Sequence, residues 1–78
     1  METWYVYITD KAGRYYVGIT TDLDSRMRQH GGTLLLYFEG PMSRAEAVIR
    51  EKSLKGWSRR KKEELIKKGS LQRKVSLP

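Results

Sequence analysis

The chain has 78 residues, of which sixteen are Lys or Arg and nine are Asp or Glu, so its formal net charge is +7. This length allows one domain with a limited core, and the absence of Cys excludes disulfides and thiolate metal sites. Charges interrupt every apolar run, so we expect a soluble, cytoplasmic protein without a membrane span. The surplus of positive charge indicates nucleic acid as a partner, with a merely basic surface or an anionic membrane as alternatives.

The first two predicted elements form a β-hairpin. The segments "TWYVYIT" (3–9) and "RYYVGIT" (14–20) are rich in β-branched and aromatic residues, and "DKAG" (10–13) supplies turn residues between them. With these four residues as the loop, Tyr7 is expected directly opposite Tyr16. Residues that lie opposite one another share a face, so the two phenols should lie side by side.

The two faces of this hairpin differ in character. One is apolar and is expected to lie in the core; it consists of Trp4, Val6, Ile8, Tyr15, Val17 and Ile19. The other gathers phenols beside a position without a side chain, namely Tyr5, Tyr7, Tyr16 and Gly18. A ligand could approach the backbone at such a glycine, so we interpret this face as a binding surface. Ordinary packing of tyrosine in half-buried strands is the alternative.

A short helix is predicted next, with a capping box formed by Thr21 and Asp24 and a Gly-Gly pair as its stop. One helical stripe should face the sheet, and it consists of Leu23, Arg26, Met27 and His30. A cation and an imidazole on such a stripe indicate a site. Alternatively, Arg26 pairs with Asp22 and His30 caps the end of the helix.

The apolar run "TLLLYFEG" (33–40) predicts a third strand. Because both of its faces are apolar, we expect it to be covered on both sides and to be the central strand of the sheet.

A second helix is predicted from the capping box of Ser43 and Glu46 to about Gly56. On this helix, apolar neighbours three and four residues away place Glu51 at the edge of the buried face. A carboxylate in that position is a candidate metal ligand. The alternative is an ordinary surface pair with Lys55, four residues later.

A third helix begins at Ser58 with a strongly basic first turn that includes Arg59, Arg60 and Lys61. Cations at a helix N-terminus oppose the helix dipole, so we interpret this turn as a contact for backbone phosphates. The basic tail 69–78 has no clear period and is expected to be disordered, which leaves residues 1–68 as the folded domain.

Together these elements predict an α+β domain of order ββαβαα, with a three-stranded, mainly antiparallel sheet flanked by short helices. The motifs "YVY" (5–7) and "YVG" (16–18), the helix "TTDLDSRMRQH" (20–30) and a later helical Glu resemble the GIY-YIG nuclease family. More narrowly, they resemble its small single-domain bacterial branch. The resemblance extends from about Thr3 to Lys67.

The resemblance implies metal-dependent hydrolysis of phosphodiester bonds, by an endonuclease with little sequence specificity. The implied catalytic residues are Tyr7, Tyr16, Arg26, His30 and Glu51, and Glu51 is the implied ligand of Mg²⁺ or Mn²⁺. We expect the substrate to be nucleic acid, with DNA favoured over RNA, and we infer no obligate protein partner. The residues expected to contact it are Tyr5, Gly18, Arg59, Arg60 and Lys61.

Three features depart from the family pattern. Tyr5 stands where the family name has Gly, the chain contains no Asn, and the connection over residues 30–41 is short. Many members carry an Asn after the catalytic Glu and another after the His, so these departures bear on turnover and on substrate choice.

The chemistry can be stated without the family. Arg26 can hold a phosphate with its guanidinium fork, and a single carboxylate such as Glu51 suits Mg²⁺ that keeps several waters. A free phenol ionises at about pH 10, so Tyr7 as the base needs a cation beside it, while Tyr16 would position water or phosphate. Two other readings remain open: a non-catalytic nucleic-acid-binding module that stacks bases on its tyrosines, and a protein-interaction domain for an acidic partner.

Overall fold

The computed structural model of the chain describes residues 3–29 and 34–76. Its elements follow the predicted order, and they are β1 (Trp4–Lys11), β2 (Arg14–Thr20), α1 (Leu23–Gln29), β3 (Leu34–Met42), α2 (Arg44–Lys55) and α3 (Arg59–Ser76). All strand pairs are antiparallel, which confirms the α+β class. The predictions made for His30 and for the Gly-Gly stop lie outside the described residues.

The central strand of the sheet is β1, because the strand order is β2-β1-β3. The prediction of a central third strand was therefore wrong. Four consecutive residues of β1, Val6 to Thr9, are buried, so both faces of that strand are covered. In contrast, β3 is only half-buried, and Leu34 is 60% exposed. An edge position also accommodates Pro41, which has no backbone N–H to donate to a neighbouring strand.

A two-residue turn at Ala12 and Gly13 closes the hairpin. Both residues have positive φ, 54° and 79°, as a type I′ turn requires. The predicted four-residue loop was too long, so Tyr7 lies opposite Gly18 and not opposite Tyr16. The pairing differs from the prediction by two residues in register. Because side chains alternate with a period of two, every residue nevertheless keeps its predicted face.

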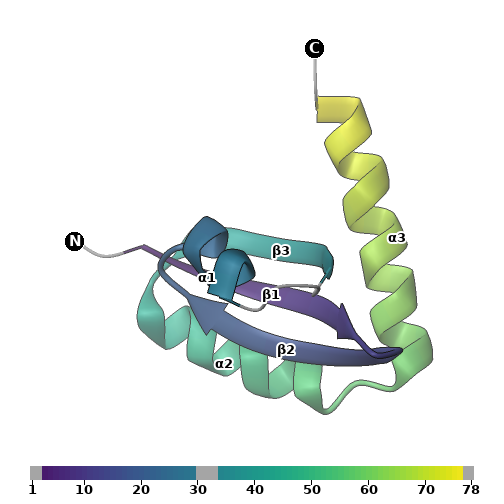
Figure 1. Cartoon of the computed structure of the whole chain (residues 1–78), viewed down its shortest axis with the longest axis horizontal. Coiled ribbons are helices and arrows are strands. Elements are labelled where there is room, and N and C mark those ends of the chain that lie inside the picture. The colour runs from purple at the N-terminus through teal and green to yellow at the C-terminus, as the bar shows by residue number, and fades with distance from the viewer. Residues whose placement is uncertain (1–2, 30–33, 77–78) are drawn as a thin grey trace.

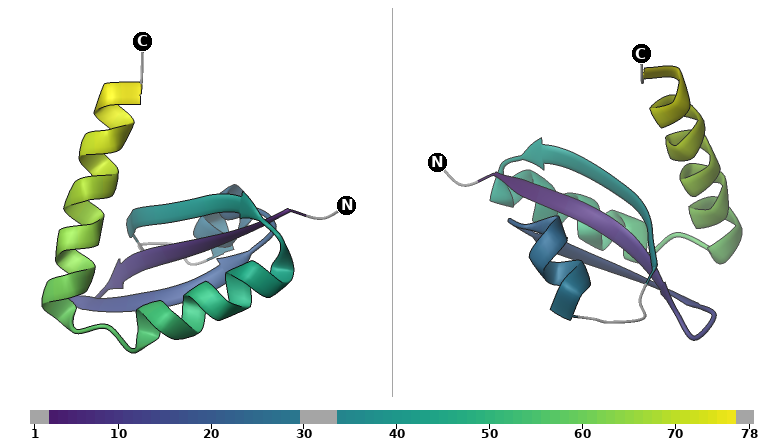
Figure 2. Two further views of the ribbon diagram at one scale, coloured as in Figure 1. Left: turned by 180° about the vertical axis from the view of Figure 1, so that it is seen from behind. Right: turned by 45° about the horizontal axis from the view of Figure 1, so that its top comes forward.

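The sheet separates two helices. Figures 1 and 2 show α1 and α2 on opposite faces of the sheet. On the α2 face, Val6 packs with Ala47 and Leu54, and all three are fully buried. Tyr7 belongs to the other face, where α1 lies. Sequence patterning therefore assigned the apolar core face and the phenol face correctly.

The predicted capping box of α2 is present. The backbone N–H of Glu46 donates to the hydroxyl of Ser43 at 3.2 Å, and the N–H of Ser43 donates to Glu46 Oε1 at 3.1 Å. Together the two bonds fix where α2 begins. Gly56 caps its C-terminus, as predicted.

The last helix, α3, begins at Arg59 and continues to Ser76, so it includes residues that we assigned to the tail. It stands at one end of the sheet (Figure 1). The Arg59 guanidinium joins it to the hairpin turn, donating to the carbonyl of Gly13 at 2.9 Å. Within the described part of the chain, no helix is long and apolar enough to cross a membrane.

Candidate active site

We predicted that Thr21 caps the N-terminus of α1. In the structure the cap is Asp22 instead. A carboxylate oxygen of Asp22 accepts the backbone N–H of Ser25 at 3.2 Å, and its second oxygen accepts the Ser25 hydroxyl at 2.8 Å. These hydrogen bonds lower the pKa of Asp22. Asp22 lies three residues before the N–H that it caps, which is the usual spacing, and this cap sets how α1 leaves the sheet.

The central contact of the site joins α1 to β1. The Nε of Arg26 donates a hydrogen bond to the hydroxyl of Tyr7 at 3.0 Å. Tyr7 is only 6% exposed, whereas Arg26 is an exposed residue. Among the described residues no ion pair joins Arg26 to Asp22, so the alternative that we considered for Arg26 is not observed. The cation of α1 instead faces a phenol of the sheet.

Gly18 makes room for that phenol. A Cβ built at Gly18 would overlap the hydroxyl of Tyr7 and would lie 2.6 Å from its Cζ. Any side chain there would displace the Tyr7 ring, so the glycine is required for the observed position of the hydroxyl. In the structure, the space beside Gly18 is therefore occupied by the Tyr7 hydroxyl, whereas we had expected a ligand to approach the backbone there.

The other two phenols share this face of the sheet. Tyr16 lies opposite Thr9 and is 49% exposed. Tyr5 makes an edge contact with the ring of Phe38, with centroids 6.1 Å apart. Tyr5, Tyr7 and Tyr16 thus lie on one face, as predicted, and Tyr16 is the one that solvent reaches most easily.

Glu51 lies on α2, which packs on the opposite face of the sheet. Its carboxylate is 3.3 Å from the ammonium of Lys55, and its side chain is 21% exposed. Arg50, the preceding residue, reaches Glu39 on β3, and the next helical residue is rotated by about 100°. Arg50 and Glu51 flank the buried Ala47 and Leu54 on opposite sides of the helix, so Glu51 lies away from β3, on the β2 side of α2. Among the described residues it has no hydrogen bond or ion pair with Tyr7, Tyr16 or Arg26.

The candidate site could hold a divalent cation through a single carboxylate, that of Glu51. The described residues contain no group of three His, Cys, Asp or Glu side chains that could hold a metal ion. Glu51 supplies one hard carboxylate, and Mg²⁺ is commonly held by one or two carboxylates together with waters and substrate phosphates. A cation at Glu51 would therefore need the substrate to complete its shell.

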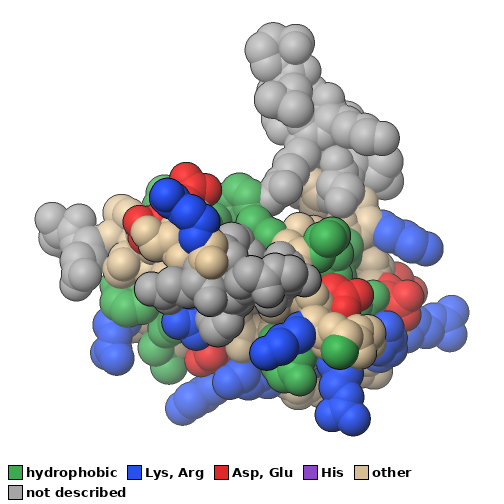
Figure 3. Space-filling model, viewed as in Figure 1, with side chains coloured by type: hydrophobic (Ala, Val, Ile, Leu, Met, Phe, Trp, Pro, Cys, Tyr) green, Lys and Arg blue, Asp and Glu red, His purple; other side chains and the backbone are tan. Residues whose placement is uncertain are grey.

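The basic first turn of α3 is partly structural. The guanidinium of Arg59 lies 4.4 Å from the centre of the Tyr15 ring, and the ammonium of Lys61 lies 5.4 Å from that of Trp57. Within the described residues, Arg60 has only a long ion pair with Glu64, at 3.8 Å. Contacts with aromatic rings therefore give two of these three cations, Arg59 and Lys61, a structural role. Figure 3 shows further Lys and Arg side chains along the rim formed by α2 and the start of α3.

A polar cluster between β3 and α2 was missed at the sequence level. Arg50 donates to both oxygens of Glu39 at 2.8 Å, and the hydroxyl of Tyr37 donates to Glu39 at 2.6 Å. Burial disfavours the charged form of Glu39 and acts to raise its pKa. The hydrogen bonds from Arg50 and Tyr37 outweigh this effect, so the pKa of Glu39 is lowered. Burial and the bond to Glu39 raise the pKa of Tyr37. No local pattern signals the cluster, because its members come from separate elements.

The chain matches known proteins over most of its length. Residues 3–64 match the model of the GIY-YIG catalytic domain. A UPF0213 protein of Cronobacter sakazakii is 38% identical, over 85% of this chain and 83% of the relative. Another, from Halalkalibacterium halodurans, is 39% identical over 80% of each chain. The UPF0213 protein YhbQ of Escherichia coli O8 is 34% identical, over 90% of this chain and 83% of the relative.

No solved structure gives a significant match. The family model nevertheless covers both tyrosine motifs, the helix that carries Arg26 and the helix that carries Glu51. The chain belongs to the GIY-YIG family.

Proposed function

We propose that the chain is a metal-dependent endonuclease that hydrolyses phosphodiester bonds in nucleic acid, DNA in particular, with little sequence specificity. The observation that carries this proposal is the hydrogen bond from Arg26 to Tyr7 beside Gly18. It places a guanidinium and a phenol oxygen together on the sheet face that also bears Tyr16. These are groups that phosphoryl transfer needs, namely a cation for the phosphate and an acceptor for a proton.

Each group has a proposed role in the reaction. The Nε of Arg26 is engaged with Tyr7, which leaves its two terminal NH₂ groups to hold the phosphoryl oxygens. The guanidinium faces the oxygen on which a Tyr7 phenolate would carry its charge, so Tyr7, once its own proton has gone to solvent, would take the proton of the attacking water. Tyr16, exposed on the same face, would position the water or the phosphate. His30 would assist Tyr7 or contact the phosphate.

Glu51 is the proposed ligand of Mg²⁺ or Mn²⁺. A divalent cation bound there supplies charge stabilisation for the phosphoryl oxygens. Because β2 is an edge strand and Glu51 lies on the β2 side of α2, a substrate strand that passes over the β2 edge would meet both the carboxylate and the phenol face. We propose that the enzyme acts on nucleic acid in the cytoplasm.

Contacts with the substrate backbone are proposed for the basic turn of α3. Arg60 is the best candidate there, because it is exposed and only weakly paired. Arg59 and Lys61 already contact aromatic rings, so they would contribute charge more than new hydrogen bonds. Such contacts do not depend on the base sequence of the nucleic acid, and they weaken as the salt concentration rises.

A second candidate function is a non-catalytic nucleic-acid-binding module. The observation that favours it is the pairing of Glu51 with Lys55, which gives the carboxylate an ordinary structural role. In that case Tyr16 and Tyr5 would stack bases, and the cations would follow the backbone.

A cleavage assay separates the two functions. Labelled single-stranded, duplex, flap and RNA substrates would be incubated with Mg²⁺, Mn²⁺ or EDTA. An endonuclease cuts at least one of them with metal and none with EDTA. A binding module cuts none of these substrates, and it binds them with an affinity that depends on salt.

A further inference from the structure

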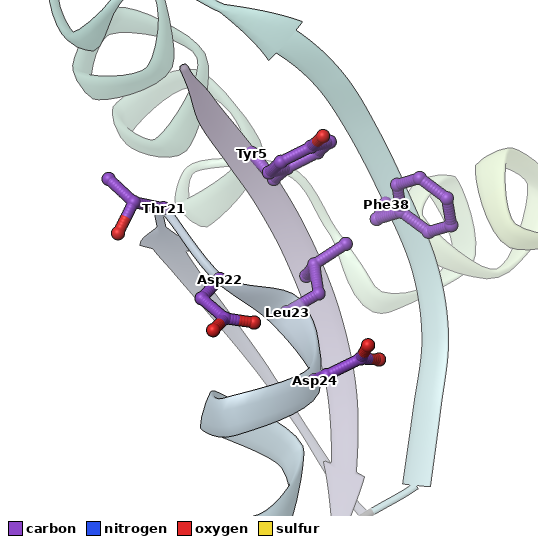
Figure 4. A pocket seen from close by; sticks show the side chains of 6 residues that line it. All are labelled: Tyr5, Thr21, Asp22, Leu23, Asp24 and Phe38. Atoms are coloured by element: carbon purple, nitrogen blue, oxygen red, sulfur yellow. The ribbon is translucent and has the colours of Figure 1, made fainter. Parts of the chain in front are cut away.

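A pocket lies between the start of α1 and the sheet, on the sheet face to which Tyr7 belongs (Figure 4). It has a volume of about 320 Å³ and is lined by Tyr5, Thr21, Asp22, Leu23, Asp24 and Phe38. Figure 4 shows the pocket between the start of α1 and strands β1 and β3, on the sheet face that carries the phenols. Its volume is at the low end of the range for small-molecule sites, about 300–1,000 Å³. It therefore suits one small planar group rather than a whole nucleotide.

Two aromatic rings form the apolar part of this pocket together with Leu23 of α1 (Figure 4). The planes of Tyr5 and Phe38 make an angle of 69°, with ring centroids 6.1 Å apart. Neither residue is fully buried. A planar group entering between α1 and the sheet can therefore lie against an aromatic face. Nucleobases bind single-strand-binding proteins in this way, whatever their sequence.

The polar part of the pocket is acidic. Both oxygens of Asp22 are engaged with Ser25. In the described part of the chain, the Asp24 carboxylate has no hydrogen bond or ion pair, and Figure 4 shows it projecting from α1 toward β3. No Lys or Arg lines the pocket. A phosphate is thus disfavoured there, whereas an amino group finds an acceptor.

The pocket and the proposed phosphate site share two elements, β1 and α1. Tyr5 and Tyr7 are two residues apart on β1, on one face, at a distance of about 7 Å along the strand. On α1, Leu23 lines the pocket, and Arg26 follows it at i+3, so the two side chains lie on the same side of the helix. A nucleic-acid strand whose phosphate meets Arg26 therefore has a neighbouring base within reach of the pocket.

We propose that this pocket binds one unpaired nucleobase of the substrate, and that Asp24 selects bases with an exocyclic amino group over thymine or uracil. The inference rests on the proposed function, because it takes the Arg26–Tyr7 site as the position of the phosphate. A carboxylate accepts a hydrogen bond from cytosine N4, whereas thymine presents an oxygen acceptor at the equivalent place. A base inside a duplex is stacked and paired, so the pocket favours single-stranded or frayed substrates.

The test compares two pyrimidine strands. Labelled oligo(dC) and oligo(dT) of equal length would be titrated with the protein in EDTA, and binding would be followed by fluorescence anisotropy. The wild type is expected to bind oligo(dC) about fivefold more tightly or better, because one good base contact contributes that much discrimination. Equal affinities for the two strands would overturn the proposal.

Two variants test the roles of the residues. Asp24→Asn can donate to a thymine oxygen, so the ratio of the two affinities should fall toward one or invert. Phe38→Leu keeps apolar volume but removes the ring face, so both affinities should fall about fivefold. Glu63→Gln, which removes one exposed carboxylate on α3, is the charge control, and it should leave the ratio unchanged. An unchanged ratio in folded Asp24→Asn would overturn the selection by Asp24.

The outcome is independent of cleavage. A protein that prefers oligo(dC) but cuts nothing with Mg²⁺ or Mn²⁺ would contradict the endonuclease and support the pocket. A protein that cuts both strands equally and binds them equally would support the endonuclease and contradict the pocket. Thermal unfolding of each variant verifies that it is folded.

Discussion

The Nε of Arg26 lies 3.0 Å from the hydroxyl of Tyr7, a residue nineteen positions earlier in the chain. Tyr7 is on the central strand and almost fully buried, while the rest of the guanidinium remains on the surface of α1. The contact therefore fixes the Tyr7 oxygen and leaves the other donors of Arg26 available to a ligand. The first two predictions follow from this geometry.

Arg26→Lys keeps the positive charge but loses the planar fork. Cleavage of the best substrate is expected to fall by about a hundredfold or more, as for removal of one donor that stabilises a transition state. Thermal unfolding should change little, because the side chain is exposed. Arg28→Lys is the matched control, since Arg28 lies on the same helix and its Nε donates to the carbonyl of Asp24, at 3.5 Å, rather than to a phenol of the sheet. Equal cleavage by both variants would contradict the role of Arg26.

Gly18→Ala introduces a methyl group where the Tyr7 hydroxyl lies. The ring must move, so we expect a loss of about 1–3 kcal/mol in the free energy of unfolding, together with a loss of cleavage. Gly56→Ala is the control, because its Cβ would make an ordinary contact at 3.5 Å with the carbonyl of Ser53. Chemical denaturation of the two variants checks the difference, and full stability of Gly18→Ala would show that the ring is not constrained there.

Much of the fold could be predicted because local signals are strong in this chain. The capping box at Ser43 and the alternation in the hairpin led directly to α2 and to the two sheet faces. The hairpin register was wrong by two residues, since a type I′ turn at Ala12 requires positive φ at a residue that does not usually adopt it. The predicted position of β3 in the sheet was wrong, because an apolar run does not determine which strand will have neighbouring strands on both sides.

The site was predictable to the extent that alternation determines it. Tyr7, Gly18 and Arg26 come together as the strand and helix periods indicate. The pairing of Glu39 with Arg50 could not be predicted, because it joins two elements whose relative position depends on the whole packing. The catalytic roles of all five residues stay predictions, namely those of Tyr7, Tyr16, Arg26, His30 and Glu51.

The Glu39–Arg50 pair leads to a prediction for the pH dependence of stability. Its hydrogen bonds lower the pKa of Glu39 below 4.5, so the stabilisation is present above that pH and is lost as the pH falls through the folded-state pKa. At neutral pH, Glu39→Gln should be less stable than the wild type by about 1 kcal/mol, allowing for partial exposure. This difference should shrink as the pH falls below 4.5 and through the folded-state pKa of Glu39. Denaturation at several pH values checks this, and a difference independent of pH would contradict it.

Arg59 and Arg60 should behave differently although they are adjacent. Arg59 contacts Gly13 and Tyr15, so Arg59→Gln should cost about 0.5–1 kcal/mol of stability. Arg60→Gln should leave unfolding unchanged and lower the slope of log affinity against log salt by about one, as for a lost phosphate contact. Anisotropy titrations at several salt concentrations measure the slope. An unchanged slope would remove Arg60 from the interface.

The central claim is that Glu51 holds the metal, and the pair of variants Glu51→Gln and Lys55→Gln tests it most directly. Both variants break the same ion pair, but only the first removes the carboxylate. Cleavage would be measured with Mg²⁺ and with Mn²⁺, and binding would be measured in EDTA. We expect Glu51→Gln to lose cleavage while its affinity in EDTA stays equal or rises slightly, and Lys55→Gln to keep cleaving. Full cleavage by Glu51→Gln, or an equal loss in both variants, would contradict the account.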